Sequence, residues 1–152
     1  MNLFQSMNIT STALTTNRLR MDVISSNMAN ADSTRAEFVD GEWQPYTRKM
    51  VALQPKARSF QSILSQTMGK NDHETSMNGV EVKEIVEDDS PFRMEYDPSH
   101  PDANEEGYVV LPNVDPLKET INLMAVTRSY EANVTVMNAA KSMYMKALEI
   151  GK

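Results

Sequence analysis

The fold is decided by residues 115–152, which read DPLKETINLMAVTRSYEANVTVMNAAKSMYMKALEIGK. Asp115 can act as an N-cap, Pro116 suits the first helical position, and Glu119 places negative charge in the first turn. An apolar stripe then recurs at seven-residue spacing, with flanking residues beside it. Its members are Leu123, Val126, Tyr130, Val134, Met137 and Tyr144. The pattern predicts a helix of about thirty residues, about 45 Å long at about 1.5 Å per residue.

The N-terminal segment carries a weaker version of the same pattern. Its seven-residue line consists of Met7, Leu14, Met21 and Met28, with Ile24 on the flanking line. Such a line suits a helix that lies along another helix. Because the polar residues Thr10 and Asn17 interrupt the stripe, we expect the isolated helix to be only marginally stable.

Glycine and proline divide the chain into three parts. All seven prolines lie between Pro45 and Pro116, and four of the five glycines lie between Gly41 and Gly107. Both residue types disfavour helix interiors, so the two ends can be helical while the middle is punctuated like strands and turns. Alternating or apolar runs predict strands near 48–53, 80–86, 92–96 and 107–111. We therefore expect an α+β fold, with an N-terminal helical domain at 1–34, a β-rich domain at 35–114 and a C-terminal helical domain at 115–152. Residues near 57–78 are polar and are predicted to form a mobile loop.

Composition narrows the class of function. The formal net charge of −6 argues against nucleic acid as a partner. The N-terminus has no basic and apolar segment of the kind found in secretory signal peptides, and no run is long enough to span a membrane. The chain has no cysteine and twelve methionines. Methionine suits surfaces that contact several slightly different neighbours, although it can equally replace leucine in a core.

The strongest candidate for chemistry is an acidic segment around one histidine. It contains Asp97, His100, Asp102, Glu105 and Glu106, at spacings that a metal ion could bridge. The alternative is a locally hydrogen-bonded turn, stiffened by neighbouring prolines. A catalytic zinc site needs three protein ligands, and no HExxH pair is present. Neither a GxSxG motif nor a phosphate-binding glycine-rich loop occurs. We expect no enzyme activity, no cofactor, no metal and no small-molecule substrate.

Several motifs resemble the rod and hook proteins of the bacterial flagellum. Residues 25–35, SSNMANADSTR, resemble the N-terminal signature of that family, and residues 128–133, RSYEAN, resemble the C-terminal one. Segments 96–98, 100–104, 107–109 and 111–115 are similar to the middle of its smaller rod members. The resemblance covers nearly the whole chain and departs mainly at 57–78. The short middle domain favours the proximal rod.

The resemblance implies both an architecture and a role. In the family, the N- and C-terminal helices pair as a coiled coil and form the inner layers of a helical tube. The chain would be a structural subunit of the basal-body rod, which transmits torque from the motor to the hook. Its partners would be copies of itself, other rod proteins and the flagellar type III export apparatus, without a cleaved signal peptide, nucleic acid or membrane insertion. The alternative is a soluble coiled-coil adaptor that stays in the cytoplasm.

The expected assembly interface follows the two helical stripes. Asn27 and Asn30 lie where the first helix should end and can bond exposed backbone groups, while Ala29 permits close approach of another backbone. Asn133 can fix helix register, as a single polar residue does in a coiled-coil seam. The full set is Met7, Leu14, Met21, Ile24, Asn27, Met28, Ala29, Asn30, Leu123, Val126, Tyr130, Asn133, Val134, Met137 and Tyr144.

Overall fold

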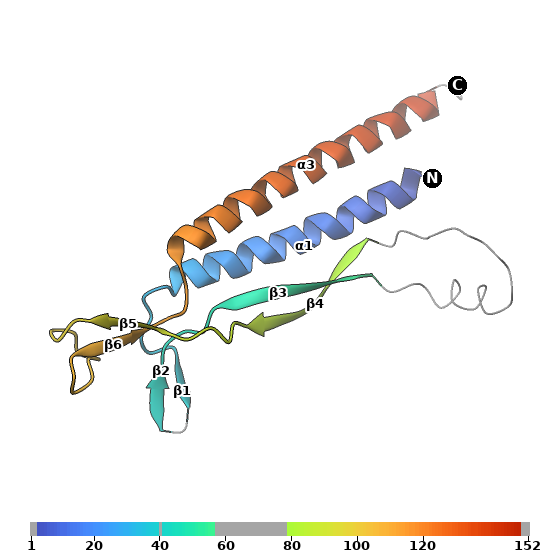
Figure 1. The fold of residues 1–152 in the computed structure, drawn as a ribbon. Helices are drawn as coiled ribbons and strands as arrows, with labels where there is room; N and C mark the ends of the chain where they lie inside the picture. The colour runs from blue at the N-terminus through green and yellow to red at the C-terminus, as the bar shows by residue number, and fades with distance from the viewer. Residues whose placement is uncertain (1–2, 40, 57–78, 150–152) are drawn as a thin grey trace, which may run out of the picture. The chain divides into compact units, whose positions relative to one another are not determined.

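The computed structural model describes residues 3–39, 41–56 and 79–149 (Figure 1). Two long helices come before and after a β-rich middle in the chain, which confirms the predicted α+β class. The elements are α1 (Leu3–Ala29), β1 (Glu37–Val39), β2 (Glu42–Gln44), β3 (Lys49–Pro55), β4 (Val80–Glu87), β5 (Arg93–Tyr96), β6 (Tyr108–Leu111) and α3 (Pro116–Glu149). The predicted loop near 57–78 lies outside the described residues.

The strands form three separate two-stranded sheets, β1–β2, β3–β4 and β5–β6. All four predicted strand segments are confirmed as β3, β4, β5 and β6. The antiparallel β1–β2 hairpin was missed, and its register places Phe38 opposite Trp43. An Asp-Gly dipeptide at 40–41 is a strong hairpin signal between short runs and could have revealed it. Gly41 has a positive φ of 91°, as such turns require.

Asn104 and Gly107 shape the turn of the β5–β6 hairpin. The Asn104 side-chain oxygen accepts hydrogen bonds from the backbone nitrogens of Glu106 and Tyr108, at 3.0 and 2.8 Å. Gly107 has a φ of 84°, and a Cβ there would lie 3.0 Å from the Tyr96 ring. Only glycine meets both conditions without strain. The turn therefore holds Tyr96 and Tyr108 edge to face, with ring centroids 5.3 Å apart.

The predicted cap of α3 is confirmed. The Asp115 carboxylate accepts hydrogen bonds from the backbone nitrogens of Leu117 and Lys118, at 2.9 and 3.3 Å. The helix begins at Pro116 and continues to Glu149, slightly longer than expected. At the end of α1, the Asn30 side chain donates to the Ser26 carbonyl oxygen at 2.9 Å. This is the backbone-bonding role that its position predicted.

Few apolar side chains are fully buried among the described residues. The chain divides into a first unit (Met1–Arg18, Leu53–Lys83 and Arg128–Lys152) and a second unit (Leu19–Ala52 and Glu84–Thr127). Among the described residues of the first unit, the buried side chains are Thr10, Thr16, Asn17 and Ala140. The second unit buries Ile24, Ala31, Val109, Val114 and Val126, together with polar Asn27 and Glu119. Most of the apolar core thus lies in the second unit.

The predicted stripe of α1 and a parallel line beside it differ in burial. The seven-residue line Met7, Leu14, Met21 and Met28 is half-buried. The parallel line through Thr10, Asn17 and Ile24 is buried, although the two polar members of that line were read as interruptions. The Thr10 hydroxyl donates to the Ser6 carbonyl oxygen at 2.9 Å, so a threonine can be buried there without an unsatisfied group.

The predicted stripe of α3 lies on the less exposed face of that helix. Val126 is buried, and Leu123, Tyr130, Met137 and Tyr144 are half-buried, while residues on the other faces are mostly exposed. In the first unit, Tyr144 packs edge to face against Phe4 of α1, with ring centroids 5.3 Å apart. Within the described ranges, neither helix is long and apolar enough to cross a bilayer.

Candidate functional site

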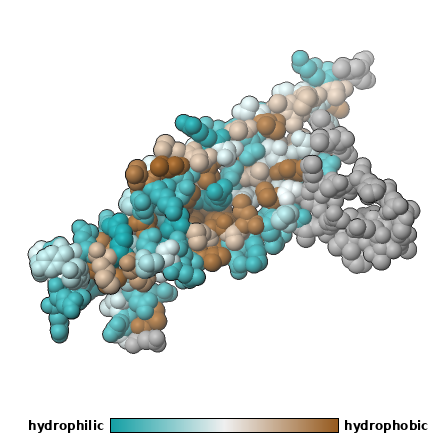
Figure 2. All heavy atoms as spheres, in the orientation of Figure 1, coloured by the Kyte–Doolittle hydropathy of each residue, from teal (hydrophilic) through white to brown (hydrophobic). Residues whose placement is uncertain are grey.

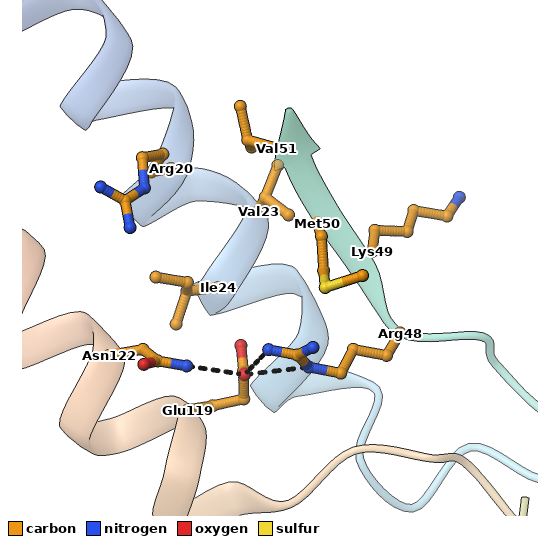
Figure 3. A pocket seen from close by; sticks show the side chains of 9 residues that line it. All are labelled: Arg20, Val23, Ile24, Arg48, Lys49, Met50, Val51, Glu119 and Asn122. Carbon is orange, nitrogen blue, oxygen red and sulfur yellow. Dashed lines mark hydrogen bonds and ion pairs between the residues drawn. The ribbon is translucent and has the colours of Figure 1, made fainter. Parts of the chain in front are cut away.

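The most deeply buried charged group of the second unit is the carboxylate of Glu119, whose residue is 0% exposed. One carboxylate oxygen accepts hydrogen bonds from Arg48 Nη2 at 2.7 Å, from Arg48 Nε at 3.1 Å and from Asn122 Nδ2 at 3.3 Å (Figure 3). The other accepts from Asn27 Nδ2 at 3.1 Å. A buried carboxylate is costly unless it is paired and fully hydrogen-bonded, and here both oxygens have partners.

Asn27 connects the end of α1 to the start of β3. Its amide nitrogen donates to the Lys49 carbonyl oxygen at 2.8 Å, and its oxygen accepts from the Lys49 backbone nitrogen at 2.9 Å. The same oxygen accepts from the Tyr46 hydroxyl at 3.0 Å. Through this pairing the Asn27 side chain bonds the β3 backbone much as a neighbouring strand would. Asn27 is therefore fully engaged within the subunit.

Arg48 joins a second carboxylate to the cluster. Its Nη1 donates to Asp88 Oδ2 at 2.9 Å, from just beyond the end of β4. Burial alone would lower the pKa of Arg48, but the hydrogen bonds to Glu119 and Asp88 outweigh it and raise the pKa above its ordinary value. The guanidinium thus stays charged between two carboxylates, in the geometry that favours arginine over lysine.

Asn113 adds the segment that follows β6. Its side-chain oxygen accepts from the Arg48 backbone nitrogen at 2.8 Å, and its amide donates to the carbonyl oxygens of Asp88 and Ser90 at 2.8 and 3.0 Å. These three bonds from one side chain hold the start of β3 and the segment after β4 next to the residues that precede α3. We call the set Asn27, Arg48, Asp88, Asn113 and Glu119 the polar cluster.

A shallow hollow of about 230 Å³ lies beside the polar cluster. Figure 3 shows its lining, which combines the charged side chains of Arg20, Arg48 and Glu119 with apolar ones. The apolar lining comes from Val23, Ile24, Met50 and Val51. Since Glu119 is already bonded to Arg48, the hollow presents positive charge and aliphatic surface, without an arranged nucleophile or a general base.

The polar cluster is suited to holding segments in place. Among the described residues, every buried side-chain nitrogen or oxygen has a hydrogen-bond partner. Within those ranges, no three His, Asp or Glu side chains gather closely enough to hold a metal ion. The arrangement joins the end of α1, the starts of β3 and α3 and the segment after β4, and so fixes their register.

Comparisons with known proteins agree with this structural role. A profile described as "Flagella basal body rod protein" matches residues 7–36, and one described as "Flagellar basal body rod FlgEFG protein C-terminal" matches residues 105–150. A Bacillus subtilis (strain 168) protein named "Flagellar basal-body rod protein FlgC" is 60% identical over 152 residues, covering 100% of both chains. The chain belongs to the FlgC family of flagellar basal-body rod proteins.

More distant FlgC relatives match over the same extent. The Borreliella burgdorferi protein is 39% identical over 161 residues, covering 99% of this chain and 98% of its own. The Salmonella typhimurium (strain LT2) protein is 37% identical over 152 residues, covering 100% of both. The resemblance seen in the sequence motifs is thereby confirmed, and the chain is a structural subunit of the flagellar basal-body rod.

The residues predicted for the assembly interface of this chain occupy three kinds of position. Asn27, Ile24 and Val126 are buried within the chain. Ala29 is exposed. The half-buried ones retain surface that a neighbour could cover, and they are Met7, Leu14, Met21, Met28, Asn30, Leu123, Tyr130, Asn133, Val134, Met137 and Tyr144. Interface membership stays a prediction for all of them.

Sequence reasoning missed most of the polar cluster. Only Asn27 was singled out, and as an assembly residue; Glu119 was noted for its place in the first helical turn. A signal for Glu119 was present, since it precedes Leu123 and Val126 at helical spacing and so shares their buried face. Arg48 and Asp88 lie 40 residues apart, and no local pattern links them.

The acidic segment around His100 forms local turns. The His100 Nδ1 atom accepts a hydrogen bond from the Asp102 backbone nitrogen at 3.1 Å, and the Asp102 carboxylate accepts from Thr34 at 2.7 Å and pairs with Arg35. The Ser99 hydroxyl donates to the Asp97 carboxylate at 2.6 Å and lowers the pKa of Asp97. Asp97 and His100 are thus engaged in the locally bonded turn that was the alternative to a metal site, whereas the Asp102 carboxylate bonds the segment before β1.

Acid should weaken the polar cluster through Asp88. Hydrogen bonds from Ser90, followed by the contact with Arg48, lower the pKa of Asp88 from 3.8 to about 2. A carboxyl group with a lowered folded-state pKa stabilises the fold above its unfolded pKa, and this contribution is lost as the pH falls from about 4 towards 2. We expect Asp88→Asn to flatten the pH dependence of unfolding in that window, as measured by urea titration at pH 2 to 6.

The matched control for Asp88→Asn is Asp89→Asn, which removes the neighbouring exposed carboxylate. This control should keep the acid-dependent loss of stability. Equal slopes for the wild type and Asp88→Asn between pH 2 and 4 would contradict the assignment.

Proposed function

We propose that this chain assembles with copies of itself and with related rod proteins into the hollow shaft that transmits torque from the motor to the hook. The observation that carries the proposal is the full-length similarity to FlgC proteins, at 60% identity to the Bacillus subtilis relative. The terminal helices would pair as a coiled coil and pack against those of neighbouring subunits. Export through the flagellar apparatus and a place in the proximal rod belong to the same proposal.

The distribution of buried side chains supports assembly through the helices. In the first unit, Ala140 is the only buried apolar residue among those described. Half-buried stripe residues line the same helical segments, and each can bury the rest of its surface against a neighbour. Burial contributes about 25 cal/mol per Å² of apolar surface, so contacts repeated along a helix and over many copies can stabilise a stiff tube.

Hydrogen exchange provides the test, comparing the purified chain with basal bodies isolated from cells. In the free chain we expect slow exchange near the polar cluster, at 20–28 and 117–126, and fast exchange at 5–17 and 130–148. In basal bodies the latter segments should become protected. Strong protection of 5–17 and 130–148 in the monomer would argue against assembly-dependent order, and absence of the chain from basal bodies would refute the proposed function.

A further inference from the structure

The hollow beside the polar cluster contains a cation without an ion-pair partner. Its lining carries three cationic side chains, Arg20, Arg48 and Lys49, and one carboxylate, Glu119. Arg48 is already paired with Glu119 and, outside the lining, with Asp88. In the part of the chain that the structure describes, no carboxylate forms an ion pair with Arg20, which is half-buried. The hollow therefore keeps a free positive charge.

The nearby acidic side chains leave that charge in place. Asp22 follows Arg20 by two residues, so it lies about 200° around α1, on the opposite side of the helix. Glu87 approaches Lys49 Nζ at 4.0 Å, but the two side chains are 59% and 45% exposed. Such an exposed, long ion pair is weak, so Lys49 adds to the positive charge of the hollow.

The form of the hollow indicates what would fill it. Its volume of about 230 Å³ is below the about 300–1,000 Å³ of pockets that take small molecules, and it suits an inserted side chain. The uncharged lining is largely aliphatic, so a carboxylate on a short aliphatic stem fits both parts of the surface. The aliphatic residues are Val23, Ile24, Met50 and Val51.

The turn of the β5–β6 hairpin presents two side chains of that kind. Residues 94–108 contain five acidic residues and no Lys or Arg. Glu105 and Glu106 are both exposed in the turn, which the Asn104 side chain closes through its bonds to the backbone nitrogens of Glu106 and Tyr108. Figure 2 shows mainly hydrophilic atoms at this end of the hairpin. A turn that is already ordered loses little freedom when it binds. We call Glu105 and Glu106 the β5–β6 tip.

We propose that the β5–β6 tip of one subunit inserts a carboxylate into the hollow of a second copy of this chain, where it pairs with Arg20. The aliphatic lining would cover the methylene groups of the inserted glutamate. The tip is not part of the lining of the hollow within one subunit. Arg35 pairs with Asp102 and leaves the tip its negative charge. The proposal rests on the proposed function, because it specifies one contact between copies in the rod.

A second copy is the occupant that the charges favour. The tip has two carboxylates and no cation, and the hollow has a free cation and no free carboxylate, so the two surfaces attract each other. Two tips repel each other, and so do two hollows. Contact between different surfaces of identical chains is heterologous, and it propagates from copy to copy into a ring or a helix. That geometry fits a tubular assembly.

Cysteine cross-linking tests the contact, and the absence of cysteine from the natural chain keeps the background low. A chain with Ala103→Cys beside the tip and Met50→Cys in the hollow keeps every charge of the proposed contact. Treating flagellated cells with a short bismaleimide should give a ladder of covalent oligomers in steps of 17.1 kDa on a denaturing gel. The matched control pairs Ala103→Cys with Ser25→Cys, at an exposed α1 position away from the hollow, and should give no ladder.

Charge reversal in the cross-linking chain provides the second measurement. Arg20→Glu alone, or Glu105→Lys with Glu106→Lys, should reduce the yield of the ladder about fivefold, the upper range for an exposed ion pair. All three changes in one chain should restore the yield. Arg20→Gln, which removes the charge without reversing it, should also lower the yield.

The outcomes separate this contact from the proposed function. The docking is overturned, and the proposed function stands, if basal bodies that contain the chain give no ladder. The same holds if the ladder is insensitive to the charge reversals, or if the tip cross-links only to a protein of different mass. Basal bodies that lack the chain would overturn both.

Discussion

Glu119→Ala is expected to lower the free energy of unfolding of the second unit by about 3–5 kcal/mol. The substitution removes the acceptor of two Arg48 bonds and of one bond each from Asn27 and Asn122. It leaves the half-buried guanidinium of Arg48 with only Asp88 as a charged partner. Breaking one side of a buried ion pair costs more than the pair contributes, because the remaining charge stays desolvated. Urea unfolding followed by circular dichroism measures the change.

Two further variants separate the ion pair from simple loss of packing. Glu131→Ala removes an exposed carboxylate from the same helix and should leave the unfolding midpoint unchanged. The double variant Arg48→Met, Glu119→Leu replaces both charges with apolar side chains and should recover most of the stability that Glu119→Ala loses. If Glu119→Ala unfolds at the same urea concentration as the wild type, the polar cluster does not stabilise the chain.

Leu14→Asp is expected to abolish swimming while leaving the second unit folded. Leu14 is half-buried in the first unit, so a carboxylate there can stay partly hydrated in the free chain. In a packed shaft the same carboxylate would be buried in every copy, and an unpaired buried charge is strongly unfavourable. Tyr130→Ala should act in the same direction, by removing a half-buried ring from α3. Soft-agar motility assays measure the effect.

The control for Leu14→Asp is Leu14→Met, which keeps the stripe apolar at nearly constant volume and should preserve swimming. Hydrogen exchange of the β5 and β6 amides measures whether the β5–β6 hairpin, and so the second unit, stays folded in the Leu14→Asp variant. Normal swimming with both Leu14→Asp and Tyr130→Ala would remove these two stripe positions from the proposed interface.

Local patterns predicted the elements of this chain well. Asp115 and Pro116 marked the start of α3, and the apolar spacing from Leu123 to Tyr144 predicted its more buried face. Four of the six strands in the described residues followed from alternation and turn residues. These features depend on neighbours in sequence, so a reading of short windows can find them.

Polar contacts between residues that are far apart in the sequence could not be predicted from such local patterns. The buried bond from Asn27 to Glu119 joins residues 92 positions apart, and the β3 backbone that Asn27 bonds is 22 positions away. The burial of the Thr10 and Asn17 side chains in α1 was also not predicted. A threonine can satisfy its hydroxyl on its own helix, so polarity alone does not place it at the surface.

The small apolar core has a consequence for the life of the subunit in the cell. A chain whose terminal helices gain much of their burial from neighbours depends on mass action, so a copy outside a rod opens far more often than one inside. Proteases cleave such open copies, and surplus subunits would be short-lived. The steady-state amount of this protein would then follow the number of growing flagella.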